Sequence, residues 1–416
     1  MSRRYRSSVI SVREALQLVC DATSVLGAER LTLPGALGRV AAEDVVSGRA
    51  VPAAPNSAMD GYAVRHADVA RAPARLRIVA VEPAGSVVSE AVTAGTAVKL
   101  FTGSVVPDGA DTVVRREDTE ERDGEVVVQV APARGANIRG TGEDIRSGQV
   151  VIAARSVLGP ADLGVLASVG RATIAVHQRP RVVILATGSE LVEVDESPGA
   201  GQVVNSNAYT LAAAVREAGG EPIVLPIVRD QPHVIREALA AALRADVLLT
   251  SGGVSVGDLD FVKEELAAVA VERLFWKVAQ KPGKPLVFGR HTHGLVFGLP
   301  GNAVSALVCF YVYVRPALRR LQGHRRLHLP VVEATLVAAV RKTAGLTEFL
   351  RVRLDDGADG PVATALPSQS SGVLTSLGSG ASLLVAPAER SELAAGVRYP
   401  VIVLSEATLA RAAPSL

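Results

Sequence analysis

Groups that could bind a phosphate and a metal ion lie together at residues 250–260, TSGGVSVGDLD. An apolar, strand-like run precedes them and a helix-compatible stretch follows, so several backbone N–H groups would point at one place near a helix N-terminus. Gly252 and Gly253 would let the backbone approach a ligand, and Ser255 adds a hydroxyl. Asp260 adds a carboxylate that could hold a cation beside the phosphate. A tight turn with solvated aspartates is the alternative interpretation.

A basic loop follows at residues 275–289, FWKVAQKPGKPLVFG. Its lysines, Lys277, Lys281 and Lys284, are interleaved with prolines and a glycine that stiffen the chain. The lysine ammonium group is a compact cation that suits oxyanions such as phosphate. A solvated basic loop is the alternative if the segment stands alone, but its place beside the glycine-rich turn favours anion binding.

Residues 181–322 alternate between apolar strands and helices, which predicts a parallel sheet covered on both faces. Ligands of such sheets bind outside the carboxyl ends of the strands. Those ends carry the TGSE segment of residues 187–190, Asp230, the turn at 250–260 and the LPGN segment of 299–302. Polar residues and glycines should therefore meet at one edge. Glu190 could instead serve its helix N-terminus, and Asp230 could cap a loop.

The rest of the chain predicts further domains. Residues 11–26 read as a helix with a capping box, and a second helix starts near residue 160. We expect these helices to pack together, which would make one domain discontinuous. Short strands dominate residues 45–140, with an exposed hairpin tip at Asp123–Gly124. Strands return after residue 330 and predict a small all-β barrel or sandwich.

Composition excludes several classes of protein. The 416 residues favour two to four domains, and 48% of them are hydrophobic, with a formal net charge of +2. Near-neutral charge and only 3% aromatic residues argue against a dedicated nucleic-acid binder. The two cysteines, Cys20 and Cys309, lie in apolar contexts and predict no disulfide framework. No secretory signal is visible, and the apolar stretch 303–314 reads as a buried helix too short to span a bilayer. We expect a cytoplasmic protein without membrane contact.

Several segments, taken in order, resemble the molybdopterin molybdenumtransferase family, the MoeA and gephyrin E-domain group. They are PNSAMDGYAV (55–64), FTGSVVPDGADTVV (101–114), RGTGEDI (139–145), ATGSEL (186–191), VVNSN (203–207), TSGGVSVGDLDF (250–261), FWKVAQKPGKPLVFG (275–289) and GLPGNAVSA (298–306). One departure is Ala303, where the family commonly has proline. Because proline at a first helical turn mainly pre-sets φ, we expect looser loop geometry rather than lost chemistry.

The resemblance implies an α/β multidomain fold. It comprises a discontinuous helical and linker domain (1–50 and 141–178), a β-rich lobe (51–140), a molybdopterin-binding α/β domain (179–328) and a C-terminal β-barrel domain (329–416). It also implies a homodimer in which the β-rich lobe of one subunit faces the α/β domain of the other. The implied activity is insertion of molybdate into adenylylated molybdopterin, with Mg²⁺-dependent release of AMP.

The resemblance also assigns site residues. The implied catalytic residues are Asp60, Thr102, Asp144, Glu190, Asp230, Asp260, Lys277 and Lys281, with Glu190 and Asp260 also holding Mg²⁺. The implied substrate-binding residues are Gly252, Gly253, Ser255, Lys284, Pro300, Gly301, Asn302, Arg351 and Ser371. Asp60 could instead merely shape its turn. Lys277 and Lys281 would neutralise molybdate, a dianion that carboxylates alone would repel.

Two rival functions remain open from the sequence. Adenylylation of molybdopterin would use a similar α/β domain, although the extra β-rich lobe and barrel argue against it. A pterin carrier or receptor-clustering scaffold would bind without turnover, but the carboxylates and lysines would then have no purpose.

Overall fold

The computed structural model describes residues 9–86, 89–253, 261–292, 294–378, 380–405 and 408. These residues form two compact units. Unit 1 contains the described residues of Met1–Glu29 and His177–Leu416, and unit 2 is Arg30–Val176.

A six-stranded sheet is the centre of unit 1, in the order β16-β13-β17-β21-β20-β18. The first four strands in this order are parallel, whereas β20 runs antiparallel to both β21 and β18. The predicted parallel sheet is therefore present, with an antiparallel hairpin at one side. The strands are β13 (Arg181–Ala186), β16 (Glu221–Val224), β17 (Val247–Ser251), β18 (Glu272–Trp276), β20 (Val287–His291) and β21 (Gly294–Leu299).

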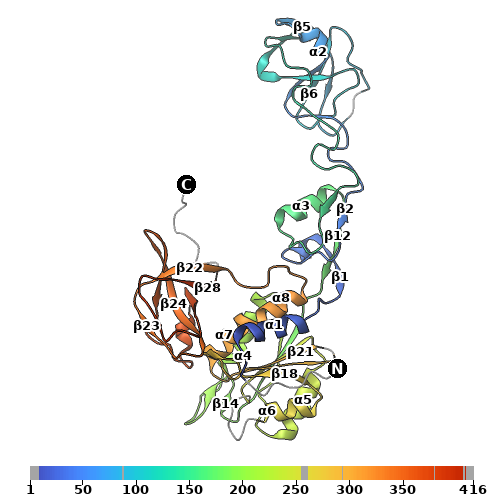
Figure 1. Ribbon diagram of the computed structural model, residues 1–416. Coiled ribbons are helices and arrows are strands. Elements are labelled where there is room, and N and C mark those ends of the chain that lie inside the picture. Colours follow the sequence, from blue (N-terminus) through green and yellow to red (C-terminus); the bar gives the residue numbers. More distant parts are fainter. Residues whose placement is uncertain are drawn as a thin grey trace. The chain divides into compact units, whose positions relative to one another are not determined.

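Helices cover both faces of this sheet (Figure 1). On β13, Val182 and Ile184 belong to the core on one face, while Val183 and Leu185 belong to the core on the other. Successive side chains of a strand point to opposite faces, and here both faces are buried under helices. The strands are therefore apolar along nearly their whole length. The helices on the first face are α4 (Ser206–Glu217), α7 (Ala303–Cys309), the π-helical turn η3 (Phe310–Val314) and α8 (Arg315–Leu321); those on the second are α5 (Pro232–Ala242) and α6 (Val262–Ala268).

The N-terminal helix α1 (Val12–Ala22) begins with the predicted capping box, in which Ser11 and Glu14 bond to each other's backbone N–H. Its buried residues Ala15 and Val19 belong to the core of unit 1, and the helix contacts α8 and η3. The second predicted helix, α3 (Pro160–Ser168), contributes Leu166 to a separate core in unit 2. The prediction that these two helices pack together is wrong, because the apolar face of α1 is buried against the α/β core.

The C-terminal strands of unit 1 form a five-stranded barrel, one of the two folds that the strand pattern left open. Its strands pair in the order β24-β25-β22-β28-β26, and a further pairing of β26 with β24 closes the ring. Leu336, Val352 and Val401 lie in its core. The strands are β22 (Val331–Leu336), β24 (Thr347–Gly357), β25 (Gly360–Ala365), β26 (Ala381–Ala386) and β28 (Arg398–Val403). The shorter elements are β14 (Leu191–Val192), β15 (Val203–Val204), β19 (Gln280–Lys281), β23 (Val340–Arg341), η4 (Leu374–Leu377) and β27 (Glu392–Leu393).

Unit 2 contains a second six-stranded sheet, in the order β7-β4-β6-β5-β9-β8. These strands are β4 (Gly61–Val64), β5 (Ala74–Glu82), β6 (Thr96–Leu100), β7 (Thr112–Arg115), β8 (Thr119–Arg122) and β9 (Glu125–Val128). Its other elements are η1 (Leu33–Ala36), β2 (Val45–Val46), β3 (Asn56–Ser57), α2 (His66–Val69), η2 (Arg116–Asp118), β10 (Ile138–Arg139), β11 (Val150–Ile152) and α3, while β1 (Ala28–Thr32) pairs with β12 (Thr173–His177).

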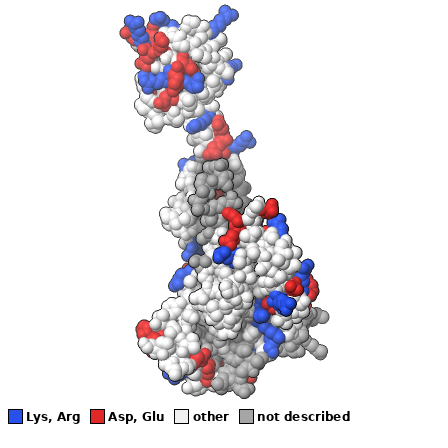
Figure 2. All heavy atoms as spheres, turned by 90° about the vertical axis from the view of Figure 1, so that its left-hand side faces the viewer, with Lys and Arg blue, Asp and Glu red and all other residues white. Residues whose placement is uncertain are grey.

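The predicted hairpin tip joins β8 to β9. Asp123 and Gly124 have φ values of 52° and 79°, which suits a two-residue turn between twisted strands. Both partners of the Arg122–Asp123 ion pair are nearly fully exposed. Figure 2 shows acidic and basic side chains interspersed on this part of the molecule. Lys99 and Glu121 form one of its ion pairs, at 2.6 Å. This hairpin tip is therefore exposed to solvent, as the sequence predicted.

Among the described residues, no helix is long and apolar enough to cross a membrane. The apolar stretch 303–314 forms α7 and η3, and Val304, Val308 and Phe310 are completely buried in the core of unit 1. The prediction of a buried core helix there is confirmed.

Candidate functional site

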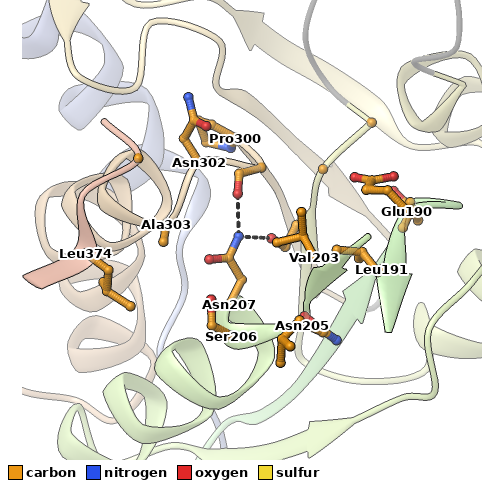
Figure 3. A pocket seen from close by; sticks show the side chains of 18 of the residues that line it. Glu190, Leu191, Val203, Asn205, Ser206, Asn207, Pro300, Asn302, Ala303 and Leu374 are labelled. Atoms are coloured by element: carbon orange, nitrogen blue, oxygen red, sulfur yellow. Dashed lines mark hydrogen bonds between the residues drawn. The ribbon is translucent and has the colours of Figure 1, made fainter. Parts of the chain in front are cut away.

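A cavity of about 680 Å³ lies at the carboxyl edge of the parallel strands in unit 1. Residues that follow β13, β16, β17 and β21 line it, as do the first turn of α4 and a loop of the barrel (Figure 3). The lining residues are Thr187, Gly188, Glu190, Leu191, Val203–Asn207, Asp230, Ser251–Gly253, Pro285, Pro300–Ala303, Gly372 and Leu374. The predicted convergence of polar residues and glycines at one sheet edge is confirmed for this set.

Two glycines form one wall of the cavity. Gly252 and Gly253 have φ values of +93° and +67°, a region that side chains other than glycine adopt at a cost. A Cβ on Gly252 would lie 2.6 Å from the Thr187 carbonyl oxygen, and one on Gly253 would overlap Val262. The hydroxyl of Thr187 is buried beside these glycines and has no hydrogen-bond partner among the described residues. Both glycines are therefore required for the backbone to pass this close to β13.

The carboxylates at the cavity differ in their surroundings. Asp230 accepts a 2.9 Å hydrogen bond from the Ser189 backbone N–H, and its own N–H bonds to the Ser189 hydroxyl at 3.3 Å. Asp230 thus has the loop-capping role that the sequence left open. Glu190 is exposed and lines the cavity, and its carboxylate has no hydrogen-bond or ion-pair partner among the described residues.

The donor set at Glu190 fits a magnesium ion in part. Mg²⁺ is bound by one or two protein carboxylates and keeps waters or phosphate oxygens as its other ligands. The unpartnered Glu190 carboxylate suits that role. No group of three or more His, Cys, Asp or Glu side chains that could hold a metal occurs in the described parts of the chain. Ser255 and Asp260, the other predicted groups of this turn, lie outside the described residues.

Asn207 is a site residue that our sequence interpretation did not single out. Its side-chain Nδ2 donates to the Ser251 hydroxyl at 2.8 Å and to the Gly301 carbonyl at 2.7 Å (Figure 3). It therefore joins the first turn of α4 to the end of β17 and to the loop after β21. Nearby, the Asn205 side chain accepts from the Ala208 N–H and caps α4. The only sequence signal was the VVNSN segment.

A barrel loop reaches the same cavity. Asn302 donates from Nδ2 to the Ser371 hydroxyl at 3.0 Å, and Gly372 and Leu374 line the cavity. Arg351 on β24 is 1% exposed, and its guanidinium donates to two main-chain carbonyls of this loop, those of Ser368 and Ser370, at 3.3 and 3.1 Å. Arg351 therefore supports this loop through its main-chain carbonyls and does not line the cavity. A direct contact between Arg351 and the substrate stays a prediction.

The three predicted lysines do not line the cavity, although Pro285 of their loop does. Lys281 lies 3.6 Å from the carboxylate of Glu348, which is only 4% exposed. Lys277 has a φ of +74°, and its ammonium group lies 3.9 Å from the centre of the Trp276 ring. Lys284 is exposed. The lysines thus belong to a structured loop beside the cavity rather than to its wall.

A buried glutamine anchors this lysine loop. Gln280 is completely buried, and its Nε2 donates to the carbonyls of Pro282 and Gly283 at 3.0 and 3.3 Å. Its Oε1 accepts from the hydroxyl of Tyr313 in η3. A Cβ on Gly283, which has a φ of +86°, would lie 2.5 Å from the Cys309 sulfur. The loop that carries Lys281 and Lys284 is therefore held in place by contacts with buried core residues.

The remaining predicted residues lie in unit 2. Asp60 Oδ1 accepts hydrogen bonds from the backbone N–H and the hydroxyl of Thr102, at 2.8 and 2.9 Å. These bonds, the backbone one first, hold the pKa of Asp60 below its ordinary value. Gly61 follows, and a Cβ there would overlap the Val114 carbonyl. Asp144 is exposed, and its backbone N–H donates to the Val51 carbonyl.

Comparison with known proteins identifies the family. Three protein-family models match consecutive parts of the chain. They are the MoeA N-terminal region (domain I and II) at residues 10–170, a probable molybdopterin binding domain at 183–320 and the MoeA C-terminal region (domain IV) at 333–404. The protein named molybdopterin molybdenumtransferase from Haemophilus influenzae is 38% identical over 326 residues, which is 78% of this chain and 80% of that protein. The chain belongs to the MoeA family.

Other MoeA relatives match nearly the whole chain. Molybdopterin molybdenumtransferase 2 from Mycobacterium tuberculosis is 35% identical over 94% of this chain and 98% of its own length. The crystal structure of the molybdopterin biosynthesis MoeA protein from Pyrococcus horikoshii OT3 has a TM-score of 0.81 at 31% identity, and the match covers 95% of this chain and 100% of that one. The α/β domain and the β-barrel described above are therefore those of a MoeA fold.

The departure from the family pattern falls on the cavity itself. Ala303 is the first residue of α7 and lines the cavity, and Asn302 precedes it in an extended conformation with a φ of −66°. The helix thus begins at Ala303 without the help of a proline, and the Asn302–Ser371 bond holds the loop before it.

Proposed function

We propose that this MoeA-family protein is a molybdopterin molybdenumtransferase, an enzyme of molybdenum cofactor biosynthesis. Its reaction is the insertion of molybdate into adenylylated molybdopterin with release of AMP. One observation on this chain itself supports the proposal, in addition to the similarity to named relatives. The cavity at the carboxyl edge of the sheet combines close-approaching glycine backbone at Gly252–Gly253 with the unpartnered carboxylate of Glu190. Backbone N–H groups suit a phosphate, and the carboxylate suits a cation bound to it.

The residues around the cavity divide the chemistry. Gly252, Gly253 and Ser255 would hold a phosphate group, and the loop of Pro300, Gly301 and Asn302 would hold the rest of the substrate. Glu190, together with Asp260, would hold Mg²⁺, which supplies polarisation of the pyrophosphate linkage and orientation of the attacking water. Asp230 orders the loop that carries Glu190 through its bonds to Ser189.

Lysines and the second unit would complete the site. Lys277 and Lys281 would neutralise molybdate, and Lys284 would bind the substrate together with Arg351 and Ser371 on the barrel side. Asp60, Thr102 and Asp144 would act from unit 2 of the partner in a homodimer, because the MoeA resemblance implies a site shared between subunits. We also propose the boundaries of the β-rich lobe (51–140), the α/β domain (179–328) and the barrel domain (329–416), and a cytoplasmic location.

The test is a reaction with purified protein, adenylylated molybdopterin and Mg²⁺, with and without molybdate. We expect AMP release that depends on Mg²⁺, together with molybdenum bound to the pterin product. Tungstate in place of molybdate shows which oxyanion is preferred. Formation of adenylylated molybdopterin from ATP would overturn the proposal in favour of the adenylylation reaction.

A second comparison separates an enzyme from a scaffold. We expect Asp60→Ala and Lys281→Ala each to slow AMP release strongly while the pterin still binds. If AMP release survives unchanged in both variants, the catalytic assignment of these residues is wrong.

A further inference from the structure

The orientation of the Asn207 side-chain amide is fixed by its neighbours. The Gly301 carbonyl oxygen can only accept a hydrogen bond, so the Asn207 atom 2.7 Å away must be the nitrogen. The second amide hydrogen goes to the Ser251 hydroxyl oxygen at 2.8 Å. Both donors of the amide are therefore used within the protein, and the side chain cannot turn over without losing the bond to the Gly301 carbonyl, which only accepts.

This clamp leaves the amide oxygen as a fixed acceptor. In Figure 3 both dashed bonds leave Asn207 from its nitrogen, and the oxygen lies on the other side of the amide group. No described residue donates a hydrogen bond to Asn207 Oδ1, and Asn207 is a lining residue of the cavity. An oriented, unpartnered acceptor in a binding cavity repels phosphate oxygens and attracts N–H or O–H donors.

We infer that Asn207 Oδ1 accepts a hydrogen bond from an exocyclic amino group on a heteroaromatic ring of the bound ligand. This inference rests on the proposed function, which supplies two such rings, the pterin and the adenine of the adenylyl group. Asn207 is then a specificity-determining residue. Its nitrogen sets the spacing between the Gly252–Gly253 wall and the Gly301 loop. Its oxygen favours ligands that place an amino group between them.

The test uses three ligands, of which AMP and purine riboside 5′-monophosphate differ only in that amino group. AMP carries the purine amino group, purine riboside 5′-monophosphate lacks it, and molybdopterin carries the amino group of the pterin. Binding of each is measured by titration calorimetry to the full chain, so no step of catalysis is needed for the readout. A single neutral hydrogen bond corresponds to a preference of about 5- to 10-fold.

Three variants distinguish the role of Asn207 as a hydrogen-bond acceptor for the ligand from its role in positioning the cavity wall. Asn207→Ala removes both the clamp and the acceptor. Asn207→Asp keeps an acceptor of the same shape but has no hydrogen for the Gly301 carbonyl. Thr210→Ala is the matched control, because Thr210 is not a lining residue and its hydroxyl donates only to the Ser206 backbone carbonyl on the same helix. Circular dichroism confirms that each variant is folded.

The expected result depends on which ring lies at Asn207. If it is adenine, the wild-type protein prefers AMP over purine riboside 5′-monophosphate, Asn207→Ala abolishes the preference, and Asn207→Asp keeps it while binding both more weakly. If it is the pterin, Asn207→Ala weakens molybdopterin binding about 5- to 10-fold and leaves AMP binding unchanged. Thr210→Ala behaves as wild type in both cases.

Two results would overturn the inference alone. One is unchanged binding of every ligand by Asn207→Ala. The other is equal weakening of all three ligands, which would make Asn207 a clamp without a role as acceptor. If the wild-type protein binds neither AMP nor molybdopterin, the proposed function fails as well.

Discussion

Thr102 donates two hydrogen bonds to one carboxylate oxygen of Asp60, from its backbone N–H at 2.8 Å and from its hydroxyl at 2.9 Å. The ionised form of Asp60 is thereby favoured, and its pKa lies below the ordinary value of 3.8. We expect Thr102→Val, which keeps the backbone bond and loses the hydroxyl bond, to raise the pKa of Asp60 towards that value. An NMR titration of the Asp60 carboxyl carbon measures the change.

The same relationship predicts a pH dependence of stability. Because the folded-state pKa is depressed, the stabilisation is present above pH 3.8 and is lost as the pH falls below it. The difference in free energy of unfolding between wild type and Thr102→Val should therefore exist at neutral pH and shrink in acid. Asp60→Asn serves as the control, since adding Thr102→Val to it should leave no pH-dependent difference in this range.

Removal of Lys281 should destabilise the protein, because Glu348 is 4% exposed. Its carboxylate would lose its ion pair and keep only the hydrogen bond from the Thr343 backbone N–H, at 3.0 Å. A fully buried charge left alone costs about 3 to 5 kcal/mol. We expect about 1 to 2 kcal/mol for Lys281→Ala, since Lys281 itself is 54% exposed and the pair is partly screened. Urea unfolding measures the loss. Lys284→Ala in the same loop should cost less than about 0.5 kcal/mol, and equal losses in the two variants would refute the pairing argument.

Alanine at Gly252 should close the cavity as well as destabilise the fold. The new Cβ would lie 2.6 Å from the Thr187 carbonyl oxygen at a φ of +93°, so β17 must shift against β13. We expect a loss of about 2 to 4 kcal/mol from overpacking and backbone strain, with AMP binding weakened at least about 10-fold. Gly201→Ala, at a φ of +82° with open space around its Cβ, should lose only about 1 kcal/mol. Retained AMP binding in Gly252→Ala would show that the glycine wall is not part of the ligand site.

Substitution of Arg351 should affect the cavity from a distance. Arg351→Leu removes the donors to the Ser368 and Ser370 carbonyls, and we expect a loss of about 1 to 3 kcal/mol. Ser371 should then move away from Asn302, which should weaken AMP binding. Arg353→Leu on the same strand is the matched control, because Arg353 is 62% exposed and its ion-pair partner among the described residues is the nearby Asp355. Similar ligand affinities in the two variants would argue against the positioning role.

The sequence predicted the architecture of unit 1 because its strands carry a strong signal. Residues such as Val182–Leu185 are apolar on both faces, which only a sheet covered by helices on both sides requires. Glu190 and Gly252 then had to meet, since the carboxyl ends of neighbouring parallel strands share one edge. The capping box of Ser11 and Glu14 was equally readable, because it is local.

What the sequence did not reveal depends on contacts between distant residues. The apolar face of α1 fits any apolar partner, so its sequence favoured α3 as readily as the core that it joins. Lys281 and its partner Glu348 lie 67 residues apart, 348 minus 281, with no pattern to connect them. Asn205 and Asn207 both stand near the start of α4, where asparagine usually means a cap. Asn205 is a cap, whereas Asn207 bonds to the Gly301 carbonyl. No local sequence pattern indicates that second contact, because its partners are far apart along the chain.

Trp276 is the only tryptophan of the chain, and the ammonium groups of Lys277 and Lys263 lie 3.9 and 4.5 Å from its ring centre. Its indole fluorescence is therefore an intrinsic reporter of the loop that carries the lysines, without any attached dye. Because an ammonium ion close to an indole perturbs its excited state, a ligand that draws Lys277 away should change the emission of the whole protein. A spectrometer and a titration of molybdate would then follow occupancy of this loop in real time.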